Sequence, residues 1–326
     1  MFSDHIIEGH NFDVIFYKLL RSINEKPQYT CSPRGSLIKE NLAVTLILDN
    51  PRARRLTSQK RLTNYGFGVG EFLWYWQGKQ DLATMVYYNK RMKDFSDDGK
   101  TLNSAYGHRI KKATFEQDKG FPTFPNASQW EACIETLCND PDSRRALLLI
   151  NWPGDNVHAA YTGSKDVPCT LSLQFFIRDG KLDLHGHMRS NDVMWGLTYD
   201  LFSFTLFQEC MLNELRCVDK FKNLELGKYY HTAGSIHLYE QHFEQAREIV
   251  KEYQETWNDL KYSCNDGDLM DPVSMQDIES LCVDEHRLRT LDVVHSVDAT
   301  GYGKSASWML EQLVNHRTKR KLEESK

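Results

Sequence analysis

Cys169 is a candidate nucleophile, because the side chains expected around it would favour its thiolate form. The register of a predicted hairpin places Cys169 opposite Ser190, with Arg189 and Asp192 on either side of that position. A thiol beside a guanidinium has a lowered pKa, and the thiolate is the nucleophilic form of cysteine. The alternative is a small buried hydrophobic residue at the start of a strand, which is the more common role of an isolated cysteine.

The hairpin follows from two runs in which apolar and polar residues alternate, 171–178 and 181–188. Asp179-Gly180 separates the runs, and this dipeptide favours a two-residue turn in which both residues adopt positive φ. Such a turn fixes the register, so that counting outward from it gives the pairing of the strand ends. The turn therefore brings Cys169 close to residues that are distant from it in the chain.

Glu71 is a candidate acid or base. The segment 70–82, GEFLWYWQGKQDL, is predicted to be a buried helix that carries two tryptophans. A carboxylate among aromatic side chains is desolvated, which raises its pKa toward the range that is useful for proton transfer. The alternative is an acidic residue in the first turn that stabilises the helix dipole.

Tyr106 is a further candidate. It lies in a long polar region at 93–125, and long structured loops are often functional.

Three further groups of polar residues are candidates, and each has an ordinary alternative. Arg144 and Arg145 open a predicted strand, where adjacent side chains point to opposite faces. Both could meet one phosphate only if the backbone is irregular or if one arginine serves another subunit. His237 and Tyr239 face the same way on an extended segment, which could also be a plain polar strand face. Asp200 lies near the first turn of a helix, where it could act as an N-cap.

The spacing of apolar residues predicts the elements that carry these side chains. A helix that is apolar on most of its circumference, at 199–217, indicates complete burial. The remaining predicted elements are helices at 11–26 and 127–138, strands at 42–48 and 146–151, and an extended segment at 230–239. Residues 240–326 are mostly polar with a helical pattern, and they end in a charged, solvated tail.

Composition restricts the class of protein. The 326 residues are 40% hydrophobic, which suits one large or two small domains, and the net charge of -5 gives no indication of nucleic-acid binding. The eight cysteines form no CxxC pair and no zinc-like cluster with histidine, so no metal site is expected. No apolar run approaches membrane length and the start does not look like a signal peptide. We therefore expect a reduced, cytoplasmic protein, in the host cytoplasm if the source is a virus.

Four segments of the chain resemble thymidylate synthases. They are EFLWYWQG, NDPDSRRALLLINW, PCTLSLQFFIRDGKLDLHGHMRSNDVMWGL and HTAGSIHLY, and the resemblance runs from about residue 12 to 245. It implies an α+β, thymidylate synthase-like fold, in which a mixed β-sheet is covered by helices and two sheets pack face to face in a homodimer. It also implies a catalytic domain at 1–245, with a divergent, mostly helical C-terminal extension at 246–326 that packs on the core or follows it.

The resemblance implies a role for each candidate residue. Cys169 would add to C6 of a pyrimidine nucleotide, and Glu71 and Tyr106 would transfer protons. The implied ligands of the nucleotide phosphate are Arg34, Arg189 and Ser190, together with Arg144 and Arg145 from the partner subunit. The implied ligands of the ribose hydroxyl are His237 and Tyr239.

The implied cosubstrate is 5,10-methylenetetrahydrofolate, with no metal. Asp192 would contact its pterin, and Trp195 would lie on the same side, where the family has a smaller apolar residue. The implied partners are therefore a pyrimidine nucleoside monophosphate, a folate and a second copy of the chain. Direct binding of nucleic acid or of a membrane is not expected.

Two residues depart from the family pattern. Thr170 follows the cysteine where the synthases usually have histidine. Asp200 stands where the synthases carry an asparagine, and this departure concerns recognition of the base. Uracil offers an N3–H donor and an O4 acceptor, whereas cytosine offers an N3 acceptor and an N4–H₂ donor. A carboxylate accepts from N4–H, and from N3–H once N3 is protonated, but it repels O4 of uracil. The exchange resembles the phage deoxycytidylate hydroxymethylases, so Asp200 is expected to read cytosine and to assist catalysis.

The implied reaction transfers a one-carbon unit to C5 of dCMP, and water completes a 5-hydroxymethyl group. Hydration is expected because the segment that closes the site of the synthases against water is not recognisable after residue 245. The alternatives are a CMP 5-hydroxymethylase, a dCMP 5-methylase, a dUMP-directed synthase or hydroxymethylase, and a non-catalytic nucleotide-binding relative. Retention of Cys169, Glu71 and Tyr106 argues against the last, since binding alone needs no nucleophile.

Overall fold

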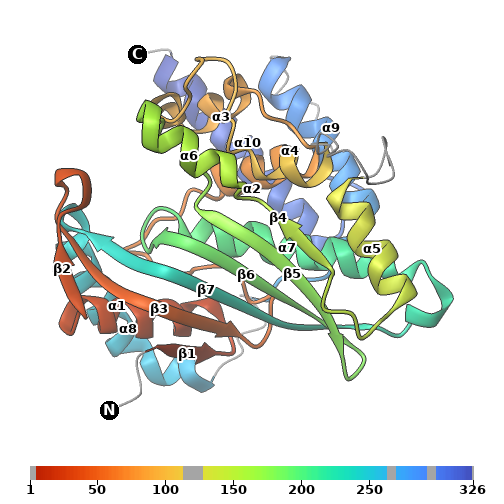
Figure 1. Cartoon of the computed structure of the whole chain (residues 1–326), viewed down its shortest axis with the longest axis horizontal. Coiled ribbons are helices and arrows are strands. Elements are labelled where there is room, and N and C mark those ends of the chain that lie inside the picture. Colours follow the sequence, from red (N-terminus) through yellow and green to blue (C-terminus); the bar gives the residue numbers. More distant parts are fainter. Residues whose placement is uncertain (1–4, 113–127, 263–268, 292–298, 325–326) are drawn as a thin grey trace.

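A mixed seven-stranded β-sheet organises the chain (Figure 1). The computed structural model describes residues 5–112, 128–262, 269–291 and 299–324. The strands are β1 (Ile6–Gly9), β2 (Tyr29–Cys31), β3 (Ile38–Leu48), β4 (Leu147–Leu149), β5 (Thr170–Arg178), β6 (Lys181–Asp192) and β7 (Glu225–Tyr239). Their order is β1-β3-β7-β6-β5-β4, with β2 pairing to β3 outside this path. The β1–β3 and β6–β7 pairs are parallel and the others are antiparallel.

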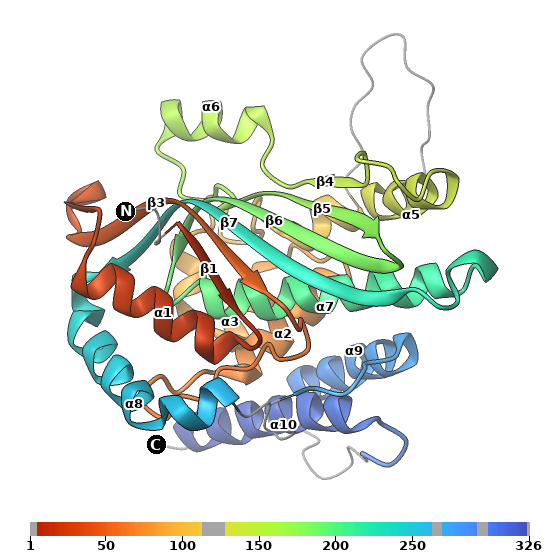
Figure 2. The same ribbon diagram turned by 90° about the horizontal axis from the view of Figure 1, so that it is seen from below.

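Helices pack on this sheet, most of them on one of its faces (Figure 2), which confirms the predicted α+β class. They are α1 (Phe12–Glu25), α2 (Tyr65–Trp76), α3 (Leu82–Tyr88), α4 (Tyr106–Lys111), α5 (Gln129–Asn139), α6 (Pro153–Thr162), α7 (Leu197–Arg216), α8 (Phe243–Tyr262), α9 (Met275–Thr290) and α10 (Lys304–Glu324). Figure 2 shows α7 and α2 below the sheet, with α9 and α10 forming a further layer beyond them. The face-to-face packing of two such sheets in a homodimer stays a prediction.

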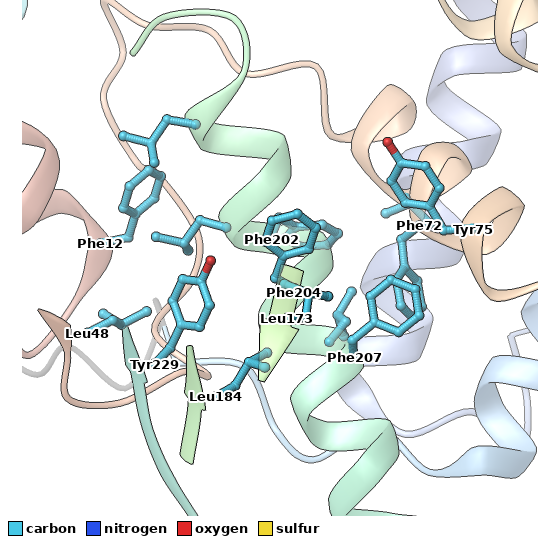
Figure 3. Packing of buried hydrophobic residues seen from close by; sticks show 14 of the residues in the cluster. Phe12, Leu48, Phe72, Tyr75, Leu173, Leu184, Phe202, Phe204, Phe207 and Tyr229 are labelled. Carbon is cyan, nitrogen blue, oxygen red and sulfur yellow. The ribbon is translucent and has the colours of Figure 1, made fainter. Parts of the chain in front are cut away.

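Helix α7 lies at the centre of the hydrophobic core. Its predicted complete burial is confirmed, because Phe202, Phe204 and Phe207 are all fully buried. Figure 3 shows these rings between the sheet and Phe72 of α2, and Phe207 packs edge-on against Phe72 with ring centroids 5.6 Å apart. Packing on both sides fixes the helix in place. It thereby also fixes the first turn of α7, which carries Asp200.

The turn between β5 and β6 is the predicted one, with φ of 49° at Asp179 and 71° at Gly180. The predicted register holds from this turn outward until Leu171, where a β-bulge shifts it by one residue. The Leu171 carbonyl accepts a hydrogen bond from Ile150 N–H at 2.9 Å, away from β6. As a result, the N–H of Arg189 donates to the carbonyl of Cys169 at 2.9 Å.

The predicted pairing of Cys169 with Ser190 is therefore wrong by one residue. A bulge adds a residue to one strand only, so simple counting from the turn fails beyond it. The correction places Arg189 rather than Ser190 directly opposite Cys169. The predicted neighbourhood of the thiol is otherwise retained, because Ser190 follows Arg189 in the same strand.

Helix α2 begins and ends earlier than the predicted 70–82. The Asn64 side chain caps its first turn by accepting from Phe67 N–H at 3.1 Å, and Gly78 follows its end with φ of 64°. Glycines weaken a helical pattern, and three of them occupy the first half of this helix: Gly66, Gly68 and Gly70. Glu71 consequently lies in the middle of α2, where stabilisation of the helix dipole does not explain it.

The chain after residue 245 forms helices that pack on the core. Helix α8 lies against α1, and α9 and α10 lie against α2. The Tyr88 hydroxyl of α3 donates to Glu285 of α9 at 3.0 Å. Because α8 begins at Phe243, the predicted boundary at 245 falls inside a helix, and the division into two domains stays a prediction. Within the described ranges, no helix has the length and apolarity that crossing a membrane requires.

Candidate functional site

Four candidate residues come together where the hairpin meets α2, α4 and α7. Cys169 precedes β5, Glu71 lies in α2, Tyr106 opens α4 and Asp200 is in the first turn of α7. Each of the four is partly exposed. Asp200 acts electrostatically on the other three. The fold thus assembles a thiol, two carboxyl groups and a phenol from four separate elements.

The Cys169 thiol is not acidified as predicted. Burial raises its pKa, Arg189 and Arg34 oppose this effect, and Asp200 adds to it. The desolvation of a thiolate therefore outweighs the two guanidinium groups, and the prediction of a lowered pKa is wrong for the free protein. Part of the donor capacity of Arg189 is also used elsewhere, since it donates to the carbonyl of Pro168 at 3.0 Å.

Basic residues predicted to bind phosphate lie near the thiol. Arg34 adopts φ of 53° and is followed by Gly35 with φ of 80°, and this left-handed conformation is uncommon for an arginine. Arg34 and Arg189 are both exposed and both influence Cys169. Ser190, next to Arg189, is partly exposed. Two guanidinium groups and a hydroxyl beside a thiol can bind an anion.

Glu71 has the raised pKa that its aromatic surroundings predict. Burial, followed by the charge of Asp200, raises the pKa of Glu71 to about 8. Tyr75, one helical turn later, hydrogen-bonds to Glu71 and stacks on Tyr106 with ring centroids 5.2 Å apart. Burial raises the pKa of Tyr106 well above its usual range. Sequence reasoning missed Tyr75 as the link, although its spacing of four from Glu71 indicates contact on a helix.

Asp200 is held by a second residue that sequence reasoning missed. Asn191 Nδ2 donates to Asp200 Oδ2 at 2.7 Å, and Asn191 is buried. Burial raises the pKa of Asp200 to about 7, while this hydrogen bond opposes the rise. The alternative role as an N-cap is excluded, because the N-cap of α7 is Gly196. Asn191 lies between Ser190, a predicted phosphate ligand, and Asp192, a predicted pterin ligand, and this position in the sequence was the signal that could have identified it.

The predicted sugar and folate ligands form a neighbouring group. The rings of His237 and Tyr239 lie 5.2 Å apart, and the ring of Trp195 lies 5.8 Å from Tyr239. Asp192 pairs with His237 across β6 and β7, and its Oδ1 accepts from Trp195 N–H. Asp192 Oδ2 is buried and has no hydrogen-bond partner among the described residues. Burial raises the pKa of Asp192 to about 6.

Arg144 and Arg145 lie apart from these groups. Both are exposed before β4, and the β4–β5 register sets Arg145 level with Phe176. Phe176 is seven residues along the strand from Cys169. At about 3.4 Å per residue, that separation is on the order of 20 Å, which is too far for contact within one chain. Across the described ranges, no cluster of three or more His, Cys, Asp or Glu residues has the arrangement of a metal site.

Comparisons with known proteins identify relatives of the chain. The family model "Thymidylate synthase" matches residues 7–288. A deoxyuridylate hydroxymethyltransferase of Bacillus phage SP01 is 36% identical over 210 residues, which cover 64% of this chain and 52% of the relative. A deoxycytidylate 5-hydroxymethyltransferase of Enterobacteria phage T4 is 30% identical over 142 residues, 44% of this chain and 53% of the relative. A thymidylate synthase of Bacillus licheniformis is 26% identical over 215 residues, 63% of this chain and 68% of the relative.

The chain spans about half the length of the phage relatives that it matches. The family match, in contrast, covers most of the chain and extends past the predicted boundary at 245. It includes every candidate residue from Arg34 to Tyr239. The resemblance found in the four sequence segments is confirmed, and the chain belongs to the thymidylate synthase family.

Proposed function

We propose that the protein transfers a one-carbon unit from 5,10-methylenetetrahydrofolate to C5 of dCMP, and that water completes a 5-hydroxymethyl group. The observation that carries the proposal is the carboxyl group of Asp200 close to the thiol of Cys169, in the position of the asparagine of the synthases. Family membership supports the one-carbon transfer. The two phage relatives support a hydroxymethyl product.

The protonation state of Asp200 suits cytosine. With a pKa raised to about 7 by burial, both the neutral acid and the carboxylate are well populated near neutral pH. The neutral acid donates to N3 of cytosine through one oxygen and accepts from N4–H₂ through the other. Uracil in the same orientation places N3–H against the donor and O4 against the acceptor. Mismatched buried polar groups give strong discrimination between substrates.

Asp200 also suits the first chemical step. The Cys169 thiol releases its proton to solvent and the thiolate adds to C6, while the electron pair of the C5–C6 double bond moves through C4 toward N3. N3 becomes more basic in this step and takes the proton of Asp200, whose carboxylate is then stabilised by the hydrogen bond from Asn191. A pKa near the working pH allows Asp200 to release this proton and to recover it when Cys169 departs.

Glu71, Tyr75 and Tyr106 are suited to carry the proton that must leave C5. Tyr75 stacks on Tyr106 and hydrogen-bonds to Glu71, so the three side chains lie together beside Cys169 and Asp200. Because the pKa of Glu71 is about 8, this carboxyl can take up and release a proton near neutral pH.

The group around Trp195 fits a folate. Asp192 Oδ2 is a buried acceptor without a hydrogen-bond partner among the described residues, and a pterin offers N–H donors to such an oxygen. Trp195 is 40% exposed and presents an aromatic surface beside Tyr239. The folate supplies the one-carbon unit at the oxidation level of formaldehyde. His237 and Tyr239 are assigned to the ribose hydroxyl, next to this group.

The proposal includes a homodimer with shared sites. Arg34, Arg189 and Ser190 bind the nucleotide phosphate from one subunit, while Arg144 and Arg145 reach it from the other. This assignment is supported by the separation, on the order of 20 Å, between Arg145 and the Cys169 of its own chain. Both arginines precede β4, which begins at Leu147, so they are not held to opposite faces as adjacent strand residues are.

Deoxyuridylate is the second candidate substrate. The deoxyuridylate hydroxymethyltransferase of phage SP01 is more similar to this chain than the deoxycytidylate enzyme of phage T4, at 36% against 30% identity. A neutral Asp200 whose proton sat on the opposite oxygen would accept from N3–H and donate to O4 of uracil. The choice between cytosine and uracil therefore depends on which of the two carboxyl oxygens of Asp200 carries the proton.

A competition experiment tests the proposal. The full chain is incubated with dCMP, CMP and dUMP in the presence of methylenetetrahydrofolate, and the products are identified by mass. The expected result is a gain of CH₂O on dCMP, with kcat/KM at least about tenfold above that for dUMP. Preferential modification of dUMP would favour the second candidate. The absence of product from all three nucleotides would contradict the proposed activity.

A further inference from the structure

A buried chain of hydrogen bonds runs from Asp200 into the core. Asn191 Nδ2 donates to Asp200 Oδ2 at 2.7 Å, and Asn191 Oδ1 lies 3.2 Å from His231 Nε2. His231 Nδ1 lies 2.8 Å from the hydroxyl oxygen of Tyr229. Asn191 is 3% exposed, whereas His231 and Tyr229 have no exposed surface. His231 and Tyr229 are therefore buried polar residues in the core, and the reaction proposed above assigns no role to either of them.

The donors in this chain point toward Asp200. Burial, with nearby histidines contributing, lowers the pKa of His231 to about 3, so its imidazole is neutral and carries one proton. Among the described residues, the hydroxyl of Tyr229 hydrogen-bonds to His231 Nδ1. If His231 donated to Tyr229, the buried hydroxyl proton of Tyr229 would have no acceptor, which is costly. Tyr229 thus donates to His231, His231 to Asn191, and Asn191 to Asp200.

Two glycines leave the space that this chain of hydrogen bonds occupies. A Cβ atom at Gly196 would lie 2.9 Å from Asn191 Nδ2 and 3.2 Å from Asp200 Oδ2. A Cβ atom at Gly186 would lie 2.9 Å from the hydroxyl of Tyr229. Contacts this short are tighter than ordinary van der Waals packing, so side chains at these positions would displace the hydrogen-bonded groups. The arrangement is therefore closely packed at both of its ends.

We propose that Asn191, His231 and Tyr229 are positioning residues that determine which oxygen of Asp200 carries the proton, and thereby which base the site accepts. Oδ2 accepts from Asn191, so the proton resides on Oδ1, the oxygen that Asn191 does not contact. The acid then presents one donor and one acceptor in a fixed order. This inference rests on the proposed function, because it takes Asp200 as the group that reads the base.

A fixed order distinguishes the two pyrimidines. Cytosine needs a donor at N3 and an acceptor at N4, whereas uracil needs an acceptor at N3 and a donor at O4. An acid whose proton moved freely between its oxygens would match either base by exchanging the two roles. The hydrogen bond from Asn191 removes this freedom, so it converts an ambiguous carboxylic acid into a selective one.

Substitutions in this chain of hydrogen bonds test the inference. Asn191→Leu retains the approximate shape of the side chain but removes its donor and acceptor, and Tyr229→Phe removes only the terminal hydroxyl. The ratio of kcat/KM for dCMP to that for dUMP is expected to fall by about tenfold in Asn191→Leu and by a smaller factor in Tyr229→Phe. Ser203→Ala is the matched control, because it removes a buried hydroxyl of α7 that has no hydrogen-bond partner among the described residues. Its ratio should equal that of the wild type.

The pH dependence of dCMP binding is a readout that a purely structural role would not change. The hydrogen bond from Asn191 favours the ionised form of Asp200, so its loss in Asn191→Leu should raise the apparent pKa of binding. The titratable groups that interact with Asp200 from the surrounding elements are Glu71, Tyr75, Tyr106, Cys169 and Tyr229. All of them are retained in both Asn191→Leu and Ser203→Ala, so the comparison isolates Asn191.

The outcomes separate this inference from the proposed function. If the wild type converts no pyrimidine nucleotide, the proposed function fails, and the ratio of the dissociation constants for dCMP and dUMP then tests the inference alone. If the wild type prefers dCMP and Asn191→Leu retains both its ratio and its pH profile, the inference is overturned while the function stands. Should Asn191→Leu not fold, an unchanged ratio in Tyr229→Phe overturns the inference in the same way.

Discussion

Asp200 and Glu71 are two acids that burial holds near or above neutrality, with pKa values of about 7 and 8. An exposed aspartate is ionised at pH 7 and cannot donate a proton to N3 of cytosine. The replacement of an asparagine by Asp200 therefore suits cytosine only together with the burial that keeps a proton on the acid. Residue identity was visible in the sequence, whereas the protonation state depends on the packing of α7 against the hairpin.

Asp200→Asn in an Asn191→Leu background should move the preference of the site from cytosine toward uracil. Without the donor of Asn191 the amide is free to turn, so its nitrogen can donate to O4 of uracil and its oxygen can accept from N3–H. A mismatched buried contact costs about 1–3 kcal/mol, so the ratio of the kcat/KM values for dCMP and dUMP should change by at least about tenfold. Steady-state kinetics with both nucleotides measures this ratio. An unchanged preference would mean that Asp200 does not read the base.

The affinity for dCMP should decrease as the pH rises through 7. The pKa of Asp200 is raised to about 7, so the proton is retained below that pH and lost above it. The donor to N3 is lost together with the proton, and binding weakens toward tenfold per pH unit once the carboxylate dominates. Calorimetric titration between pH 6 and about 9 measures the effect. Asp200→Asn is the control, because it retains the titration of the nucleotide phosphate; a profile equal to that of the wild type would contradict the assignment.

At the scale of elements, the sequence predicted features that depend on one segment alone, and it did not predict contacts between distant segments. The turn at Asp179-Gly180 and the burial of α7 follow from patterns within one segment, and both are confirmed. The bulge at Leu171 depends on hydrogen bonds to the segment after β4, so the register of β5 alone did not indicate it. The hydrogen bond between His231 and Asn191 joins residues 40 positions apart in two strands, and no short pattern encodes it.

Gly107 is the point at which α4 approaches α2. A Cβ atom there would lie 1.9 Å from the carbonyl oxygen of Tyr75, and a backbone atom cannot move aside as a flexible side chain can. Gly107→Ala should therefore lower the free energy of unfolding by about 1–3 kcal/mol. It should also lower kcat, because it separates Tyr106 from Tyr75. Urea denaturation and steady-state kinetics measure the two effects.

The matched control for Gly107→Ala is Gly154→Ala in α6. A Cβ atom at Gly154 meets nothing within 4 Å, so the substitution should leave stability unchanged or increase it by up to about 1 kcal/mol. Equal effects of the two substitutions on stability and on kcat would show that the close approach of α4 to α2 does not set the position of Tyr106.

At the scale of the whole molecule, one chain does not contain all of the predicted site. The sequence predicted that Cys169, Glu71, Tyr106 and Asp200 act together, and the fold does assemble them. Arg145 instead lies on the order of 20 Å along the sheet from Cys169. The adjacency of Arg144 and Arg145 in the sequence suggested this problem, but only the strand register gives the separation.

Complementation between two inactive variants tests the shared site. In a mixed dimer of Cys169→Ala and Arg145→Ala chains, one of the two sites would contain both an intact thiol and an intact arginine from the partner. Random mixing should restore about a quarter of the wild-type activity, since half of the dimers are mixed and each has one complete site. Activity and native mass spectrometry are measured on the same sample. Verified mixed dimers without activity would place Arg145 at the site of its own subunit.

The most direct test of the central claim is to follow the reaction with dCMP and methylenetetrahydrofolate in water enriched in heavy oxygen. Addition of water to the one-carbon unit on C5 predicts a cytosine nucleotide that has gained CH₂O, with the heavy oxygen in the new group. Cys169→Ala should bind dCMP and form no product, because only the covalent step is lost. A gain of CH₂ alone with accumulation of dihydrofolate, or product formation by Cys169→Ala at the wild-type rate, would contradict the proposed reaction.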